Sequence, residues 1–126
     1  MDYNALSVVK MTVNPSESLL GEVEQLVLLA VLRLDGQAYA NPVRDLIHRD
    51  AGVTLFRGSV YITLERLERK RYVESWFSAP TAERGGKAKR LFRIRPEGVA
   101  ALRASRGAVD RLAAGTIVAR ESGKRA

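Results

Sequence analysis

The sequence predicts a mainly α-helical fold with one small β-hairpin, and three observations support this prediction. Four segments repeat apolar residues at three- and four-residue spacing, which is typical of amphipathic helices. Between the third and fourth segments the pattern changes to short β-branched and aromatic runs around Gly85-Gly86, which is typical of a hairpin. The 126 residues are 46% hydrophobic and contain no cysteine, so one domain can bury a single core without disulfides.

The first two predicted helices both end at a glycine. The first spans residues 19–34, stops at Asp35-Gly36 and turns a wide apolar face to the core, made of Leu19, Leu20, Val23, Leu26, Val27, Ala30, Val31 and Leu34. The second has Asn41 as its N-cap and Pro42 at its first helical position. It spans about three turns before Gly52, and its buried stripe consists of Val43, Leu46 and Ile47.

The third predicted helix leads into the hairpin. It runs from residue 57 or 58 to about residue 71, and its buried side consists of Val60, Leu64 and Leu67. The hairpin pairs residues 72–77 with residues 89–94 and has a long, basic tip at residues 80–88. A short helix, a second helix and a basic hairpin in this order predict a winged helix-turn-helix.

The fourth predicted helix opens at Pro96-Glu97 and contains many alanines, which allow a second helix to approach closely. Its larger apolar side chains exceed what the three-helix core needs, so we expect dimerisation through Val99, Leu102, Val109 and Leu112. The predicted division of the chain is an N-terminal arm of uncertain structure at residues 1–17, the winged helix-turn-helix at 18–95, the dimerisation helix at 96–118 and a disordered tail at 119–126.

The basic surplus of the chain lies in one segment. Residues 57–95 hold eleven basic and four acidic residues, whereas the rest holds ten of each, so this segment carries the whole formal charge of +7. Such a segment is typical of a surface that binds the phosphates of a nucleic acid. A solvated basic face without a partner explains the charge equally well.

The outward face of the third helix carries the candidate DNA contacts. Ser59 lies in the first turn, where its hydroxyl and free backbone N–H groups can hold a phosphate. Ile62 can contact a thymine methyl group, and Arg66 can reach a base edge. For Arg66 and Arg69 the alternative is a solvated helix face on which Glu65 pairs with Arg69, and Glu68 with Arg71. For Tyr61, phosphate contact through its hydroxyl and core packing are equally plausible.

The predicted wing adds a second set of candidate contacts. Its basic residues are expected to touch the DNA backbone or the minor groove, and they are Arg84, Lys87, Lys89 and Arg90. We expect Trp76, in the first strand of the wing, to have a packing role.

Several function classes lack the residues that they require. His48 is the only histidine and there is no cysteine, so we expect no metal site, no cofactor and no catalytic activity. Gly86-Lys87 is followed by Ala88 and therefore does not match a phosphate-binding loop. The longest apolar run, residues 26–32, is too short to cross a membrane, so we expect a soluble, cytoplasmic protein.

Three stretches of the chain carry a family resemblance. GEVEQLVLLAVLRL at residues 21–34, GSVYITLERLERK at 58–70 and PTAERGGKAKRLFRIRPEG at 80–98 together resemble the PadR family of bacterial transcriptional regulators, and most closely its short subgroup with a single C-terminal helix. The resemblance implies a homodimeric repressor that binds a palindromic operator on double-stranded DNA. Some relatives also bind flat hydrophobic ligands, so a small hydrophobic effector is a further candidate partner.

Carried over by position, the resemblance covers part of the predicted surface. Ser59 and Tyr61 match the serine and tyrosine that open the family's recognition helix, and its basic wing is matched by Lys87, Lys89 and Arg90. The sequence departs from the family's pattern at Asn41-Pro42, where a glycine is common. It departs again at Arg71, where a glycine usually ends the third helix, so a left-handed residue would cost about 1 kcal/mol.

Two other functions fit parts of the sequence. An RNA- or ribosome-associated basic module fits the charge, but such modules usually expose aromatic residues for base stacking, and the aromatics here mostly lie at apolar-patterned positions. A winged helix used only for protein contacts has no need of a basic wing.

Overall fold

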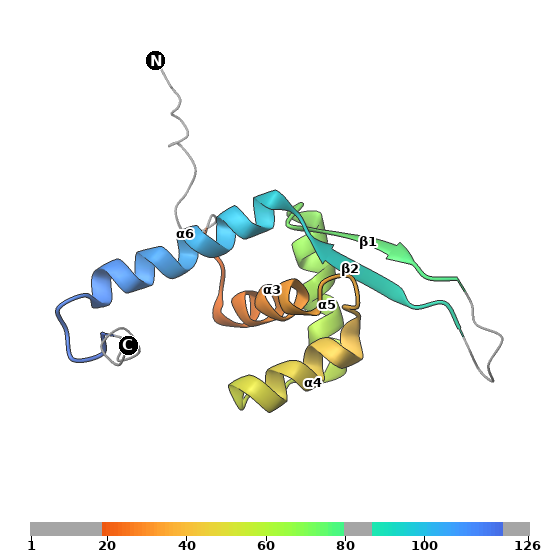
Figure 1. Cartoon of the computed structure of the whole chain (residues 1–126), viewed down its shortest axis with the longest axis horizontal. Helices are drawn as coiled ribbons and strands as arrows, with labels where there is room; N and C mark the ends of the chain where they lie inside the picture. The colour runs from red at the N-terminus through yellow and green to blue at the C-terminus, as the bar shows by residue number, and fades with distance from the viewer. Residues whose placement is uncertain (1–18, 80–86, 120–126) are drawn as a thin grey trace, which may run out of the picture. The chain divides into compact units, whose positions relative to one another are not determined.

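The computed structural model describes residues 19–79 and 87–119, so the predicted arm at residues 1–17 and most of the predicted tail lie outside the described residues. The elements are α3 (Glu22–Leu34), α4 (Ala40–Ala51), α5 (Arg57–Arg69), β1 (Val73–Phe77), β2 (Arg90–Ile94) and α6 (Pro96–Ala113) (Figure 1). The chain divides into two compact units: residues 20–100, and a unit whose described residues are Leu19 and 101–119. The predicted mainly α fold with one hairpin is confirmed. None of the helices in the described ranges is long and apolar enough to cross a membrane.

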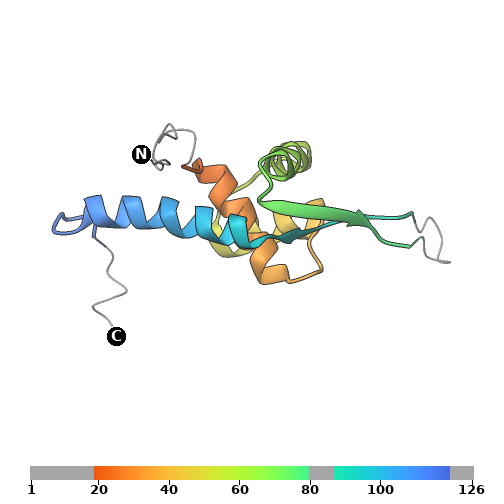
Figure 2. The ribbon, with the colours of Figure 1, turned by 90° about the horizontal axis from the view of Figure 1, so that it is seen from above.

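The core of residues 20–100 lies where three helices and the hairpin meet. Helix α3 packs against α4, α5 and β2, and α5 also packs against α4 and β1. The largest side chains with no more than 1% exposure come from all of these elements, and they are Phe92, Leu28, Leu64, Leu67, Val27, Val31, Val43, Val60 and Val73. The hairpin projects beyond the three helices (Figure 2), so only its base contributes to this core.

The two strands are antiparallel, with Val73 opposite Ile94 and Phe77 opposite Arg90. Because side chains alternate across a sheet, Phe92 enters the core while Arg93 faces solvent. The loop before α4 extends this sheet: the backbone N–H of Phe92 donates to the carbonyl of Ala38 over 2.8 Å. No sequence pattern indicates this bridge, because a single paired residue shows no alternation.

The first two helices begin at other residues than those predicted. Helix α3 starts at Glu22, so Leu19 precedes it and is 43% exposed. Helix α4 starts at Ala40, so Tyr39 is its N-cap and the predicted cap, Asn41, lies inside it. Pro42 is tolerated there because the first backbone N–H groups of a helix have no intrahelical acceptor. As predicted, α3 stops before Asp35-Gly36, and Gly52, with φ 71°, ends α4.

Helix α5 ends at Arg69, two residues before the predicted end, in a hydrogen-bonded cap. The N–H of Arg71 donates to the carbonyl of Glu68, and the N–H of Tyr72 donates to that of Leu67, both over 2.9 Å. This Schellman motif needs a left-handed residue at its centre, and Arg71 has φ 69°. The left-handed arginine considered from the sequence is therefore present.

A half-buried ion pair joins the start of α3 to the end of α5. The carboxylate of Glu24, which is 7% exposed, accepts a hydrogen bond from Lys70 Nζ over 2.8 Å and another from the backbone N–H of Gly21 over 3.0 Å. Burial alone raises the pKa of Glu24, but the hydrogen bonds from Lys70 and Gly21 outweigh it and lower the pKa below its ordinary value of 4.5. Glu24 is therefore ionised at neutral pH.

We expect Glu24→Gln to lower the free energy of unfolding by about 1–3 kcal/mol at pH 7, because Lys70 loses its charged acceptor. A carboxyl with a lowered folded-state pKa stabilises above its unfolded pKa, and this stabilisation is lost as the pH falls through the folded-state pKa. Urea unfolding should therefore show the difference between the wild type and the variant shrinking as the pH falls below 4.5. The control is Glu22→Gln, an exposed residue of the same turn. A pH-independent difference for Glu24→Gln would contradict the assignment.

We expect Arg71→Gly to raise the free energy of unfolding by about 1 kcal/mol, because glycine adopts the left-handed conformation without a Cβ clash. Arg69→Gly is the control; it lies within α5 with ordinary helical geometry, so it should lower stability by about 1 kcal/mol. Thermal or urea unfolding of both variants measures the two effects. A loss of stability in Arg71→Gly would show that its side chain has a structural contact that outweighs the strain.

Candidate nucleic-acid interface

Helix α5 presents one exposed face opposite its buried stripe. Val60, Leu64 and Leu67 are fully buried as predicted, so the opposite face points to solvent. The predicted contacts on that face are all exposed, and they are Ser59, Ile62, Arg66 and Arg69. Ile62 is 55% exposed, although it is a large apolar residue. The structure therefore brings these four side chains to one surface, which has the curvature of a single helix and fits a groove.

Arg90 of β2 forms a network with α5 that the sequence analysis did not predict. Its guanidinium donates to the hydroxyl of Tyr61 over 2.6 Å, to the carboxylate of Glu68 over 2.5 Å and to that of Glu65 over 3.3 Å. Its Nε also donates to Ser75 Oγ over 3.2 Å. The guanidinium lies 5.2 Å from the ring centroid of Phe92 and 5.6 Å from that of Tyr61. One side chain thus joins both strands of the hairpin to α5.

The groups around Arg90 favour its charged form. Partial burial alone lowers the pKa of Arg90, but the hydroxyl of Tyr61 and the carboxylate of Glu68 outweigh it and raise the pKa. The side chain is 23% exposed, so little of it is available to a phosphate. Arg90 and the Tyr61 hydroxyl, both expected to contact DNA, are engaged with each other in this network, and their contact with DNA stays a prediction.

The two glutamates of α5 have different partners from those considered in the sequence. Glu65 and Glu68 both pair with Arg90, 25 and 22 residues away, rather than with Arg69 and Arg71 one turn along. The alternative of a helix face neutralised by pairs within α5 is therefore wrong. The positive charges of Arg66 and Arg69 stay on the exposed face.

The described part of the wing holds two exposed lysines, Lys87 and Lys89. The backbone of Lys89 is fixed, because its N–H donates to Ser78 Oγ over 2.9 Å and its carbonyl accepts the N–H of Ser78 over 2.8 Å. Its ammonium lies 5.4 Å from the ring centroid of Tyr39. The fourth predicted wing contact, Arg84, lies outside the described residues.

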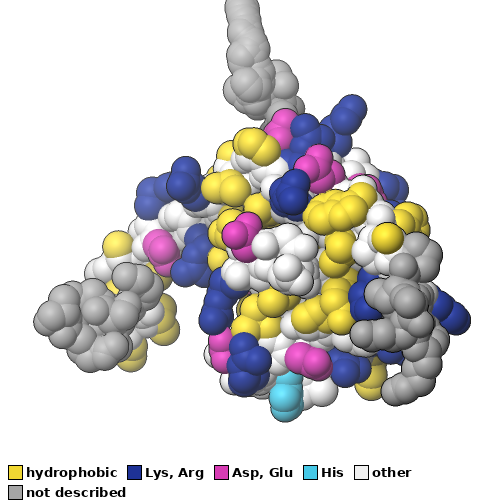
Figure 3. Space-filling view, turned by 45° about the vertical axis from the view of Figure 1, so that its right-hand side comes forward, with side chains coloured by type: hydrophobic (Ala, Val, Ile, Leu, Met, Phe, Trp, Pro, Cys, Tyr) yellow, Lys and Arg dark blue, Asp and Glu magenta, His cyan; other side chains and the backbone are white. Residues whose placement is uncertain are grey.

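Basic and apolar side chains are interspersed on this part of the molecule. Figure 3 shows one face of the molecule on which Lys and Arg side chains lie beside apolar ones, with several Asp and Glu among them. Two phenylalanines are among the exposed apolar residues, Phe56 at 81% and Phe77 at 68%. Neither was predicted from the sequence, in which the aromatics mostly lie at apolar-patterned positions. Phe56 lies directly before a helix and outside its apolar stripe, which is the signal that could have identified it.

The remaining candidate residues, His48 and Trp76, both contact neighbouring side chains. His48 is exposed, and its Nδ1 forms a hydrogen bond with Thr54 Oγ1 over 3.1 Å. Among residues 19–79 and 87–119, no cluster of three or more acidic residues or histidines could hold a metal ion. Trp76 is half-buried on the outer side of the hairpin, where the guanidinium of Arg93 lies 4.9 Å from its ring centroid.

The same fold occurs in several solved regulators. A PadR-like transcription factor from Bacteroides fragilis matches with a TM-score of 0.62 and 17% identity, over 83% of this chain and 91% of that one. A PadR family transcription regulator from Clostridium difficile gives 0.60 and 18%, over 74% and 95%. A PadR family transcriptional regulator from Eggerthella lenta gives 0.59 and 22%, over 94% and 91%. Comparison with protein-family models and with curated proteins finds no match.

At these identities the likeness establishes the fold. The predicted winged helix-turn-helix is confirmed: α4 and α5 are its helix pair, and β1 and β2 form its wing. The resemblance to the PadR family, predicted from three stretches of sequence, is confirmed at the level of structure.

We expect Arg90→Ala to lower the free energy of unfolding by about 1–3 kcal/mol, because Glu65 and Glu68 lose their cation and Glu68 keeps only the hydrogen bond from Ser75 Oγ. The matched control is Arg93→Ala in the same strand. Arg93 is 56% exposed and lies 3.9 Å from Glu74, so its loss should change stability by no more than about 0.5 kcal/mol. Urea unfolding followed by circular dichroism compares the two, and equal losses would refute the structural role of Arg90.

Proposed function

We propose that this chain, which has the fold of the PadR regulators, is a sequence-specific DNA-binding transcriptional regulator of that family that represses genes as a homodimer. The observation that carries the proposal is the exposed face of α5, where Ser59, Ile62 and two arginines lie together beside a basic wing. The pairing of Glu65 and Glu68 with Arg90 supports it, because both carboxylates contact the hairpin and Arg90 offsets one of their two negative charges. Neighbours with the same fold are transcription regulators.

We assign different tasks to the helix and to the wing. Arg66 reads a base edge, Ser59 holds a phosphate, and Ile62 contacts a thymine methyl group in the major groove. Lys87 and Lys89 bind the DNA backbone and supply affinity with little sequence information. Arg90 acts as a positioning residue that fixes the angle between the wing and α5.

The second half of α6 is the proposed dimer contact. Val109 is 63% exposed and Leu112 is 84% exposed, and the following turns expose Ile117 and Val118 as well. Val109 and Val118 line a shallow cavity of about 550 Å³. A second copy of this chain would bury this surface, and its two-fold axis would match a palindromic operator.

The other two residues expected at the dimer contact have less solvent-exposed area. Leu102 is only 4% exposed, and Val99 is half-buried. The proposed contact therefore uses Val109 and Leu112. No cofactor or catalytic step enters the proposal, and the proposed location is the cytoplasm.

RNA binding is the second candidate function. Exposed Phe56 and Phe77 favour it, because single-stranded RNA is bound by stacking bases on aromatic rings. The two rings lie on different elements, however, whereas the four candidate contacts of α5 share one face that fits a duplex groove. The two functions are separated by competition: single-stranded RNA of the same sequence should displace labelled duplex DNA only if the protein binds RNA.

The central test is selection of duplexes from a random pool, followed by binding of the selected sequence and a scrambled one at a single salt concentration. Arg66→Ala should reduce the preference for the selected duplex by about tenfold or more and leave scrambled binding nearly unchanged. In contrast, Lys87→Ala/Lys89→Ala should weaken both duplexes alike. For this lysine variant, the slope of the logarithm of the binding constant against the logarithm of the salt concentration should flatten by up to about two units per chain.

Either half of this expectation can fail. An equal loss on both duplexes in Arg66→Ala would place Arg66 on the phosphates. A loss confined to the selected duplex in the lysine variant would show that the wing reads bases. If no sequence is enriched by the wild type, the proposed function is wrong.

We expect Leu112→Glu to yield a monomer, because a carboxylate in the apolar contact would have to be desolvated. Sedimentation equilibrium measures the mass, and affinity for the selected duplex should fall together with it. Leu32→Glu is the control, an exposed leucine of α3 at 44% exposure. A Leu112→Glu variant that stays dimeric would place the interface elsewhere.

A further inference from the structure

We propose that Phe56 is a specificity-determining residue of the DNA-binding surface and that its ring contacts a thymine 5-methyl group next to the base pairs contacted by α5. The inference rests on the proposed function and deepens it. It assigns a role to a residue outside the exposed face of α5, and it predicts a feature of the operator, namely a thymine whose methyl group contributes to binding.

The structure presents the ring of Phe56 to solvent on a fixed backbone. Phe56 is the N-cap of α5, with φ −76° and ψ 145°, and its carbonyl accepts the N–H of Val60 over 3.1 Å. Two residues earlier, Thr54 is tied to α4 by its hydrogen bond with His48. The ring is nevertheless 81% exposed. A fixed backbone with an exposed aromatic side chain is a preorganised contact, since little conformational freedom remains to be lost on binding.

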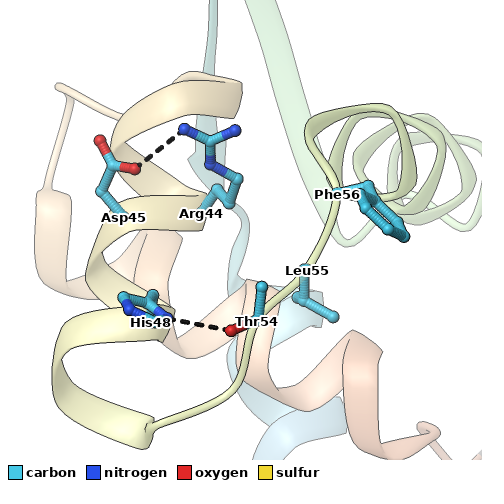
Figure 4. A pocket seen from close by; sticks show the side chains of 6 residues that line it. All are labelled: Arg44, Asp45, His48, Thr54, Leu55 and Phe56. Atoms are coloured by element: carbon cyan, nitrogen blue, oxygen red, sulfur yellow. Dashed lines mark hydrogen bonds and ion pairs between the residues drawn. The ribbon is translucent and has the colours of Figure 1, made fainter.

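The neighbouring side chains leave the ring uncovered. Figure 4 shows the side chain of Phe56 turned away from His48 and Thr54, with which it lines a cavity of about 310 Å³. The guanidinium of Arg57 is drawn toward α4, where it donates to Asn41 Oδ1 over 3.4 Å. Gly58 has no side chain. The ring therefore faces solvent at the N-terminal end of α5.

The charge around the ring favours a polyanion as the occupant. Arg57 follows Phe56 in the chain, and Arg66 and Arg69 are exposed further along α5. Asp45 of α4 lines the same cavity as Phe56, and its carboxylate pairs with Arg44 over 3.3 Å. The exposed ring thus lies at one end of a helix whose exposed charged residues are arginines, and this arrangement fits a partner that is negative at its edges and apolar at one point. The major groove of DNA offers this chemistry only where a thymine presents its methyl group between the two phosphate backbones.

Ile62 is a second exposed apolar residue of the same surface. It is 55% exposed and lies nearly two turns further along α5, so Phe56 and Ile62 contact different base pairs. Because the two side chains contact different positions, the thymine preference at each position can be assigned to one residue.

The experiment uses the full chain and the duplex selected from a random pool, in which each thymine is replaced in turn by deoxyuridine. This replacement removes only the 5-methyl group. For the wild type we expect the affinity to fall about fourfold at one position of each half-site because of Phe56, and at a second position of each half-site because of Ile62. Phe56→Ala should bind the thymine duplex about fourfold or more weakly and lose sensitivity to deoxyuridine at the first position alone. Ile62→Ala should lose it at the second position.

Phe77→Ala is the matched control, since Phe77 is also an exposed phenylalanine but lies in β1; it should keep both sensitivities. Unfolding curves should show that Phe56→Ala is as stable as the wild type, as expected for an exposed side chain. The proposal is overturned if Phe56→Ala keeps the full pattern of deoxyuridine sensitivity, or if it weakens selected and scrambled duplexes equally. A monomeric Phe56→Ala would show that the ring contacts a second copy instead. Failure of the wild type to select any sequence would overturn the proposed function itself, which is a separate outcome.

Discussion

The contact between Arg90 and α5 is the interaction on which the arrangement of the candidate surface depends. The hairpin reaches the core only through residues at its base, such as Val73 and Phe92, so apolar burial alone fixes one end of it. The guanidinium of Arg90 adds a polar contact beyond that base, to Glu68 and Tyr61. Because a planar guanidinium donates in fixed directions, this contact sets an orientation as well as a distance.

The same contact also directs the carboxylates of α5 away from its exposed arginines. A helix that presents arginines to a polyanion must keep its acidic residues from cancelling their charge. Glu65 and Glu68 turn toward the hairpin, where Arg90 offsets one of their two negative charges, while Arg66 and Arg69 stay exposed. One ion-pair network therefore docks the wing, directs both carboxylates toward the hairpin and leaves two arginines exposed on the outward face of α5.

Both ends of α5 are fixed by contacts outside the proposed surface. Lys70 at the C-terminal end pairs with the buried carboxylate of Glu24, and the connector before the N-terminal end is held by the hydrogen bond between His48 and Thr54. A helix fixed in this way presents its side chains at defined positions, which direct reading of base edges requires. The left-handed Arg71 is the local strain that the tight turn into β1 requires.

The sequence by itself determined the elements and the exposed face of α5, because these follow from local periodicity and from glycine and proline signals. Val60 and Leu64 were identifiable as core by spacing alone. Only the tertiary structure decided the partners of Glu68, because Arg90 lies 22 residues away and no local pattern links them. It likewise decided the exposure of Phe56, since composition shows that a residue is apolar but only packing shows whether anything covers it.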